Sequence, residues 1–146
     1  QQMVTQSNNN SWELFYTLLG RQNIEKYVHD LGSKDFKISD NTVKAGDMTN
    51  YLSKLYKNQL HSKETTDYLL SLMQKTNEET FIPKSVAGFT IYHKNGQLEE
   101  VVNEAVLAVG KDSTYAIAIY TDGKDKWEYE KRRVLFKDLI TDILKN

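Results

Sequence analysis

Residues 101–120, VVNEAVLAVGKDSTYAIAIY, contain two nearly continuous apolar runs separated by a short polar stretch. The runs occupy residues 101–109 and 115–120, and residues 110–112 between them are glycine, lysine and aspartate. Aliphatic runs of this length, joined by a short turn, are typical of consecutive antiparallel strands. Because residues 115–120 are apolar on both alternating faces, we expect this strand to lie inside a sheet, beside a further strand or helix.

The sequence on either side of this hairpin extends the sheet and covers it. Residues 86–93 form another extended run, and Gly96 is expected to separate this strand from the next. After Gly123, apolar residues recur at helical spacing and predict a long C-terminal helix. The face of this helix expected to pack on the sheet carries Val134, Leu135, Leu139, Ile140, Ile143 and Leu144.

The first half of the chain has helical periodicity instead. Apolar residues at helical spacing predict one helix over residues 10–19 and a second over residues 24–31, with Asn23 as its N-cap. Asp47 and Ser62 are the expected N-caps of a third and a fourth amphipathic helix.

These elements predict an α+β fold, in which a helical cluster is followed by antiparallel strands and a C-terminal helix. A chain of 146 residues can bury one core but is too short for two ordinary domains. We therefore expect a single unit over residues 1–146, with a helical part over residues 1–80 and the sheet and final helix over residues 81–146. The only proline, Pro83, falls at this change of periodicity.

The composition argues against several classes of function. A net charge of -1 provides no basic surface for nucleic acid or for an anionic membrane. No apolar run reaches the roughly 18 residues that a membrane span requires. There is no cysteine, and the three histidines are scattered at His29, His61 and His93, so we expect no metal site. No glycine-rich phosphate loop occurs, and we expect no cofactor.

Two short polar motifs point to a family. Residues 7–9, Ser-Asn-Asn, precede the first long helix, and residues 94–96, Lys-Asn-Gly, follow the first predicted strand. Their order and context resemble the Ser-Asp-Asn and Lys-Thr-Gly motifs of class A β-lactamases and related penicillin-binding serine hydrolases. The resemblance covers nearly the whole chain and implies the carboxy-terminal portion of the β-lactamase/transpeptidase-like fold.

The third signature of that family, the nucleophilic Ser-x-x-Lys, is absent, because no serine is followed by lysine three positions later. The resemblance therefore implies that the upstream strands and the nucleophile helix would lie before Gln1. We expect the chain by itself to be inactive.

The resemblance assigns roles to individual residues. It implies that Ser7 passes a proton to the departing nitrogen of the substrate, while Lys94 attracts the substrate carboxylate and favours proton transfer through Ser7. Asn9 would bind the amide side chain of the substrate. Gly96 would let the substrate approach the strand, and the backbone N–H of Gln97 would be one of two oxyanion donors.

Three departures from the family pattern limit these roles. Asn8 replaces the middle aspartate of the first motif. Asn95 replaces the hydroxyl residue of Lys-Thr-Gly, and its larger amide could bind a carboxylate but would crowd the groove. Residues 33–46, read as the active-site loop, contain no glutamate to activate a deacylating water, so we do not expect rapid β-lactam turnover.

Two hypotheses follow from the resemblance. In the first, the chain is part of a serine hydrolase that acts on β-lactam or peptidoglycan-type amides, and this part contains Ser7 and Lys94 but not the nucleophile. In the second, it is a non-catalytic binding or sensing module of the same fold. An N-terminal companion fragment or a second chain would complete the sheet. By analogy, the parent protein would work in the cell envelope of a bacterium or outside it. A third alternative is an unrelated α+β interaction domain.

Simpler interpretations remain open for each feature. Residues 7–9 can be helix-capping residues, and residues 94–96 can be a hairpin turn. His93 is expected to be a polar residue of an edge strand rather than a base. Residues 131–133, Lys-Arg-Arg, are expected on a solvated helix face. The apolar stripe of the first long helix is assigned to the core and comprises Trp12, Phe15 and Leu18.

Overall fold

A computed structural model describes residues 1–76, 82, 85–98, 101–122 and 129–145 of the chain. Its helices are α1 (Gln2–Thr5), α2 (Asn9–Leu19), α3 (Arg21–Asp30), α4 (Ala45–Tyr56), α5 (Lys63–Met73) and α6 (Tyr129–Lys145). Its strands are β1 (Ser85–Val86), β2 (Phe89–Gln97), β3 (Val101–Val109) and β4 (Thr114–Asp122). The predicted α+β fold is confirmed. The breaks predicted at Pro83 and Gly123, and the boundary after residue 80, lie outside the described residues.

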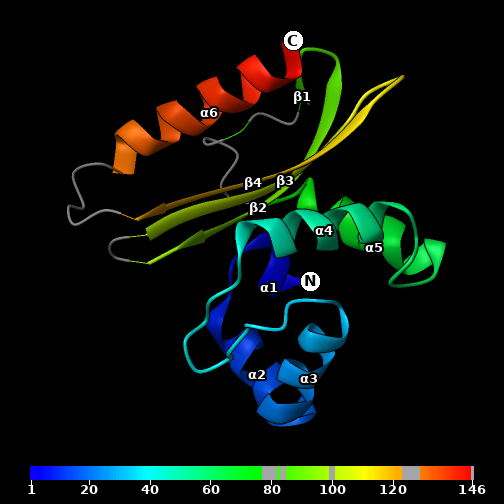
Figure 1. Ribbon diagram of the computed structural model, residues 1–146, viewed down its shortest axis with the longest axis vertical. Helices are drawn as coiled ribbons and strands as arrows, with labels where there is room; N and C mark the ends of the chain where they lie inside the picture. The colour runs from blue at the N-terminus through cyan, green and yellow to red at the C-terminus, as the bar shows by residue number, and fades with distance from the viewer. Residues whose placement is uncertain (77–81, 83–84, 99–100, 123–128, 146) are drawn as a thin grey trace.

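The elements form layers around one antiparallel sheet (Figure 1). Helix α6 covers one face of the sheet, α4 and α5 lie on the other, and α1 to α3 form a group beyond them. The helical half and the sheet half of the sequence are therefore also separate layers in space. The N-terminus, in α1, lies on the side of the sheet opposite to α6.

The sheet has the strand order β1-β2-β3-β4, and every pair of neighbours is antiparallel. The strand predicted over residues 86–93 is split by a turn at Ala87 and Gly88, whose φ angles of 49° and 86° suit a tight hairpin. The expectation that Gly96 separates two strands is wrong, because Gly96 lies inside β2 and pairs with Asn103. Among the described residues, β4 pairs with β3 alone. It therefore lies at an edge of the described sheet and not inside it as was predicted.

The predicted helix starts are only partly confirmed. The hydroxyl of Ser62 caps α5 by accepting a hydrogen bond from the Thr65 backbone N–H at 3.2 Å. Asp47 is not a cap, because it lies in the first turn of α4 and accepts a hydrogen bond from the Ser33 hydroxyl at 2.7 Å. Asn23 lies inside α3 rather than before it. Both helices therefore begin two residues before the predicted cap.

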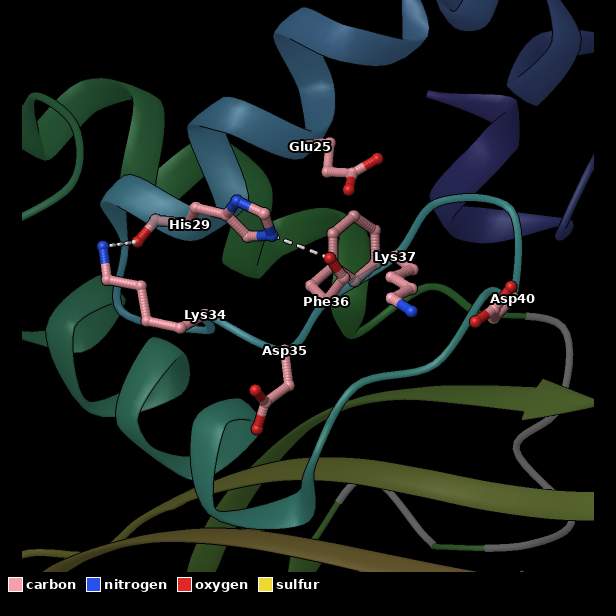
Figure 2. A pocket seen from close by; sticks show the side chains of 7 residues that line it. All are labelled: Glu25, His29, Lys34, Asp35, Phe36, Lys37 and Asp40. Carbon is pink, nitrogen blue, oxygen red and sulfur yellow. Dashed lines mark hydrogen bonds between the residues drawn. The ribbon is translucent and has the colours of Figure 1, made fainter.

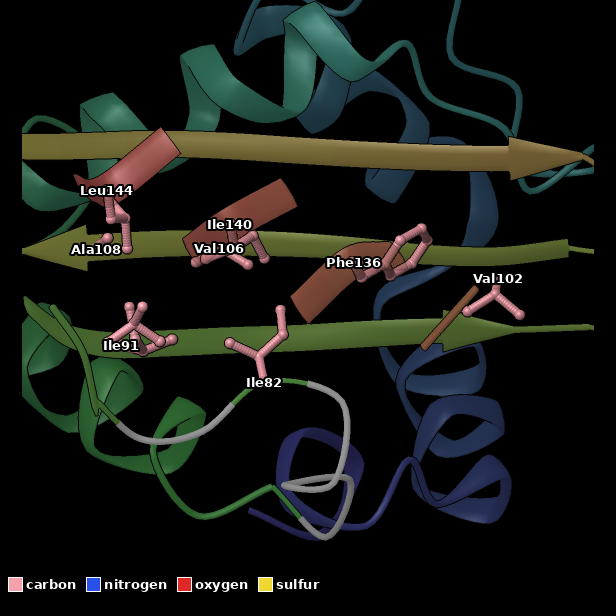
Figure 3. Close-up of a cluster of buried hydrophobic side chains, with 9 residues drawn as sticks. Ile82, Ile91, Val102, Val106, Ala108, Phe136, Ile140 and Leu144 are labelled. Atoms are coloured by element: carbon pink, nitrogen blue, oxygen red, sulfur yellow. The ribbon is translucent and has the colours of Figure 1, made fainter. Parts of the chain in front are cut away.

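Helix α6 meets the sheet along one narrow stripe (Figure 3). Phe136, Ile140 and Leu144, spaced four residues apart, are 0%, 0% and 6% exposed and pack against the strands. Only two of the six residues predicted for this face are buried. The other four are exposed, because the sheet contacts a single row of the helix, and they are Val134, Leu135, Leu139 and Ile143.

A second cluster fills the opposite face of the sheet. Because side chains alternate along a strand, Val106 of β3 points to α6 while Leu107 joins the cluster under α4 and α5. Both side chains are fully or almost fully buried. This strand is covered on both sides, as its continuous apolar sequence requires. The helical members of the second cluster are Leu52, Leu55, Leu70 and Met73.

Two assignments of side-chain exposure made from the sequence are wrong. Phe15 and Leu18 of α2, assigned to the core, are 42% and 71% exposed in this chain. Arg132, assigned to a solvated face, is only 7% exposed because it occupies the same row of α6 as Phe136.

No helix in the described part of the chain is long and apolar enough to cross a membrane.

Gly110 is expected to tolerate no side chain. A Cβ atom at this position would lie 2.6 Å from the ring of Phe89, which is itself held edge-to-face against Tyr115 with ring centroids 5.6 Å apart. We expect Gly110→Ala to lower the free energy of unfolding by about 1–3 kcal/mol, the usual cost of overpacking. Urea titration of the variant measures this loss in the free energy of unfolding. Gly46→Ala is the control, because a Cβ there meets nothing within 4 Å; a similar loss in both variants would contradict the prediction.

Candidate active site

The two sequence motifs meet in space, although they lie on different layers. Lys94 is on β2, on the strand face that carries Tyr92 and turns toward the helices. Its ammonium nitrogen donates to the hydroxyl oxygen of Ser7 at 2.6 Å across a sequence separation of 87 residues. It also donates to the backbone oxygen of Asn95 at 2.5 Å and to the Asn95 side-chain oxygen at 3.1 Å.

Ser7 lies in the short connection between α1 and α2 and has an unusual backbone. Its φ angle is 49°, in the left-handed region that costs energy for residues other than glycine. The helix cap is supplied by the next residue, because Asn8 accepts a hydrogen bond from the Ser11 backbone N–H at 2.8 Å. Capping therefore accounts for Asn8, whereas the Ser7 hydroxyl bonds to Lys94. Asn9 is exposed in the first turn of α2.

The second motif is part of the strand ladder. Asn95 pairs with Glu104, Gly96 with Asn103 and Gln97 with Val102, so the interpretation of residues 94–96 as a hairpin turn is wrong. Gly96 and Gln97 are exposed. A Cβ atom on Gly96 would meet nothing within 4 Å, so the space beside this strand is open. Asn95 differs, because it is only 8% exposed and its amide oxygen faces Lys94.

The strained backbone of Ser7 gives a prediction that is independent of any substrate. Ser7→Gly and Ser7→Ala both remove the hydroxyl, but only glycine adopts a positive φ without steric cost. We expect the glycine variant to be more stable than the alanine variant by about 1 kcal/mol in free energy of unfolding. Chemical denaturation of the two variants measures this difference. Equal stability would show that the backbone at residue 7 is not strained.

A buried polar cluster lies directly behind Lys94. His93 lies in β2, beyond the two residues of that strand that pair with β1, and is only 2% exposed. Its Nδ1 is 2.8 Å from Oε1 of Glu104, and its Nε2 is 3.1 Å from the hydroxyl of Thr76. Sequence reasoning missed both partners, because no local pattern connects residues so far apart in the chain. In the described residues no group of three or more potential ligands could hold a metal ion.

Helix α3 and the loop over residues 33–46 border a separate cavity of about 420 Å³ (Figure 2). Its shape is held by His29, whose ring nitrogen Nε2 is 2.7 Å from the carbonyl oxygen of Phe36. Asp35 and Lys44 form an exposed ion pair, and the hydrogen bond from Lys44 lowers the pKa of the Asp35 carboxyl. Neither Ser7 nor Lys94 lines this cavity.

The chain belongs to the β-lactamase enzyme family, whose sequence model matches residues 1–146. The family and the fold therefore define the class as that of the β-lactamase-like and penicillin-binding serine hydrolases, the family that the sequence motifs resemble. No curated protein matches the sequence of this chain.

Solved structures share the fold at low sequence identity. A β-lactamase from Vibrio parahaemolyticus, encoded on the chromosome, has a TM-score of 0.80 and 18% identity, and the match covers 99% of this chain and 62% of that one. The protein PBP-A has a TM-score of 0.79 and 22% identity, with 99% and 59% covered. A β-lactamase from Sphaerobacter thermophilus DSM 20745 has a TM-score of 0.73 and 20% identity, with 83% and 52% covered. The chain thus spans between half and two thirds of the length of these structures.

Proposed function

We propose that this chain supplies one wall of the active site of a serine hydrolase that opens β-lactams or peptidoglycan-type amides. The observation that carries the proposal is the 2.6 Å hydrogen bond between Lys94 and Ser7, made across the two layers of a β-lactamase fold. A hydroxyl held by an ammonium group is suited to passing a proton to a leaving nitrogen. In this role Ser7 gives its proton to the amine and regains one from Lys94.

Lys94 has a second role in the proposal. Its positive charge attracts a carboxylate on the substrate, and that charge lies beside the reacting bond where it also favours proton transfer. Asn9 binds the amide side chain of the substrate. Gly96 leaves room for substrate beside β2, which agrees with the open space around a Cβ at that position. The backbone N–H of Gln97 donates to the oxyanion, and Asn95 contributes its amide at the same edge.

The nucleophile comes from residues other than Gln1–Asn146 in this proposal, since the chain has no Ser-x-x-Lys. A companion segment, in the same polypeptide or a second one, supplies it and covers the apolar side chains exposed on α2 and α6. The open side of β4 in the described sheet is a further place where such a segment can pair. A protein with this activity on cell-wall amides would work in the cell envelope or outside the cell.

A second candidate is a β-lactamase-fold module that binds without reacting. Asn95 favours it, because a buried amide replaces the hydroxyl of Lys-Thr-Gly. The loop over residues 33–46, which lacks glutamate, favours it as well.

Denaturing mass spectrometry of the full-length gene product with benzylpenicillin distinguishes the two candidates. We expect a covalent adduct of one penicillin mass that persists after free penicillin is removed, because no loop glutamate is present to activate water. The control is the same sample treated with hydrolysed penicillin. Absence of any adduct would contradict the hydrolase and support the binding module, and rapid loss of the adduct would contradict the role assigned to the loop.

A further inference from the structure

The side chains of Thr76, His93 and Glu104 form a continuous chain of hydrogen bonds inside the protein. The three residues are 2%, 2% and 1% exposed. A neutral imidazole with its proton on Nδ1 donates to Glu104 and accepts from the hydroxyl of Thr76, and a protonated imidazole donates to both. The bonds to His93 are therefore satisfied in either state, which keeps its ring in one orientation.

The cluster spans the strand pair at the position of Lys94. In the register of the sheet, Lys94 pairs with Ala105, His93 with Val106 and Asn95 with Glu104. The bond from His93 to Glu104 thus runs diagonally across the pair that contains Lys94, on the opposite face of the sheet. Diagonal neighbours of this kind are within reach of long side chains.

Polar groups at this depth are not needed to hold the sheet together. The rest of this face is filled mainly by aliphatic and aromatic side chains, with Asn95 and Arg132 as further buried polar residues. Apolar residues of similar volume can replace a buried pair with no loss of stability. A hydrogen bond, however, sets direction and distance more narrowly than apolar packing does. The cluster therefore restricts how β2 lies against β3 where Lys94 emerges.

We propose that Thr76, His93 and Glu104 are positioning residues for Lys94, which hold β2 so that the lysine nitrogen reaches Ser7. The proposal deepens the proposed function, since it concerns the lysine given the catalytic role there. The geometry itself is independent of that role, because the contact with Ser7 exists without substrate.

Competitive acetylation of the full-length protein tests this proposal without any penicillin. Acetic anhydride labels lysine amines, and peptide mass spectrometry gives the ratio of labelling at Lys94 to labelling at Lys54. Lys54 is a matched control in the same molecule, since its nitrogen donates to the carbonyl oxygen of Leu31 at 2.8 Å, within the helical layers. A lysine whose nitrogen is hydrogen-bonded reacts slowly, because those hydrogen bonds must break before the nitrogen can attack the reagent.

In the double variant His93→Leu/Glu104→Leu we expect this ratio to rise by about fivefold, the effect of losing one ordinary hydrogen bond. Glu104→Gln should keep the ratio near that of the unchanged protein, since its amide oxygen still accepts the Nδ1 proton of His93.

An unchanged ratio in a folded double variant would overturn the proposal. Should that variant not fold, Thr76→Val provides the second test, because it removes one partner of His93 while keeping the side-chain volume. It should raise the ratio in the same direction, and an unchanged ratio there would overturn the proposal equally. A protein that forms no penicillin adduct would end the hydrolase proposal and leave these labelling results unaffected.

Discussion

Lys94→Met is expected to slow acylation of the full-length protein by benzylpenicillin about 10²–10⁴-fold, the range typical of a lost proton-transfer group. Methionine keeps an unbranched side chain of nearly the same length but removes the charged nitrogen that contacts Ser7 and Asn95. The second-order rate constant of adduct formation, followed by mass spectrometry, measures the effect.

The matched control for this variant is Lys54→Met. This substitution removes one hydrogen bond, from Lys54 to the carbonyl oxygen of Leu31, and Ser7 is not part of it. The acylation rate of the Lys54 variant should stay within about twofold of the unchanged protein, since the lost bond lies within the helical layers and outside the site. Equal slowing in both variants would mean that Lys94 acts through stability and not at the site.

Phe136→Ala should lower the free energy of unfolding by about 3–5 kcal/mol, the usual cost of removing a buried aromatic ring. The ring is fully buried between α6 and the sheet (Figure 3), and no neighbour can fill its space without leaving its own contacts. Urea-induced unfolding followed by circular dichroism measures the loss.

Leu139→Ala on the same helix is the control for this prediction. Leu139 is 39% exposed in this chain, so in the chain by itself the change in free energy should be within about 0.5 kcal/mol. In the full-length protein, where the proposed companion segment covers α6, we expect a larger loss at Leu139; a small loss there would contradict that cover.

Local patterns predicted most elements because each depends on neighbouring residues. The apolar runs at residues 101–109 and 115–120 form β3 and β4, because aliphatic residues in short runs favour extended strands. Ser62 was identified as a cap from the short hydroxyl side chain before a helical period. Asn95 and Gly96 form the strongest local turn signal in the chain, yet pairing with β3 overrides it and keeps them extended.

Helix faces were predicted less well, because periodicity identifies an apolar face but not its neighbour. Six residues of α6 were predicted to form its buried face. The sheet contacts only one row of the helix, which contains Phe136, Ile140 and Leu144. Arg132 lies in that row, although its charge predicts exposure. The width of the contact depends on how a straight helix crosses a twisted sheet.

The amino-acid sequence by itself determined the order of helices and strands, the family and the two motifs that carry the proposed chemistry. Tertiary structure alone decided that Lys94 reaches Ser7 and that His93 lies between Thr76 and Glu104. The physical reason is distance along the chain. Contacts between residues 11 to 87 positions apart form only when the helical layers pack on the sheet in one register, and no local period encodes that packing.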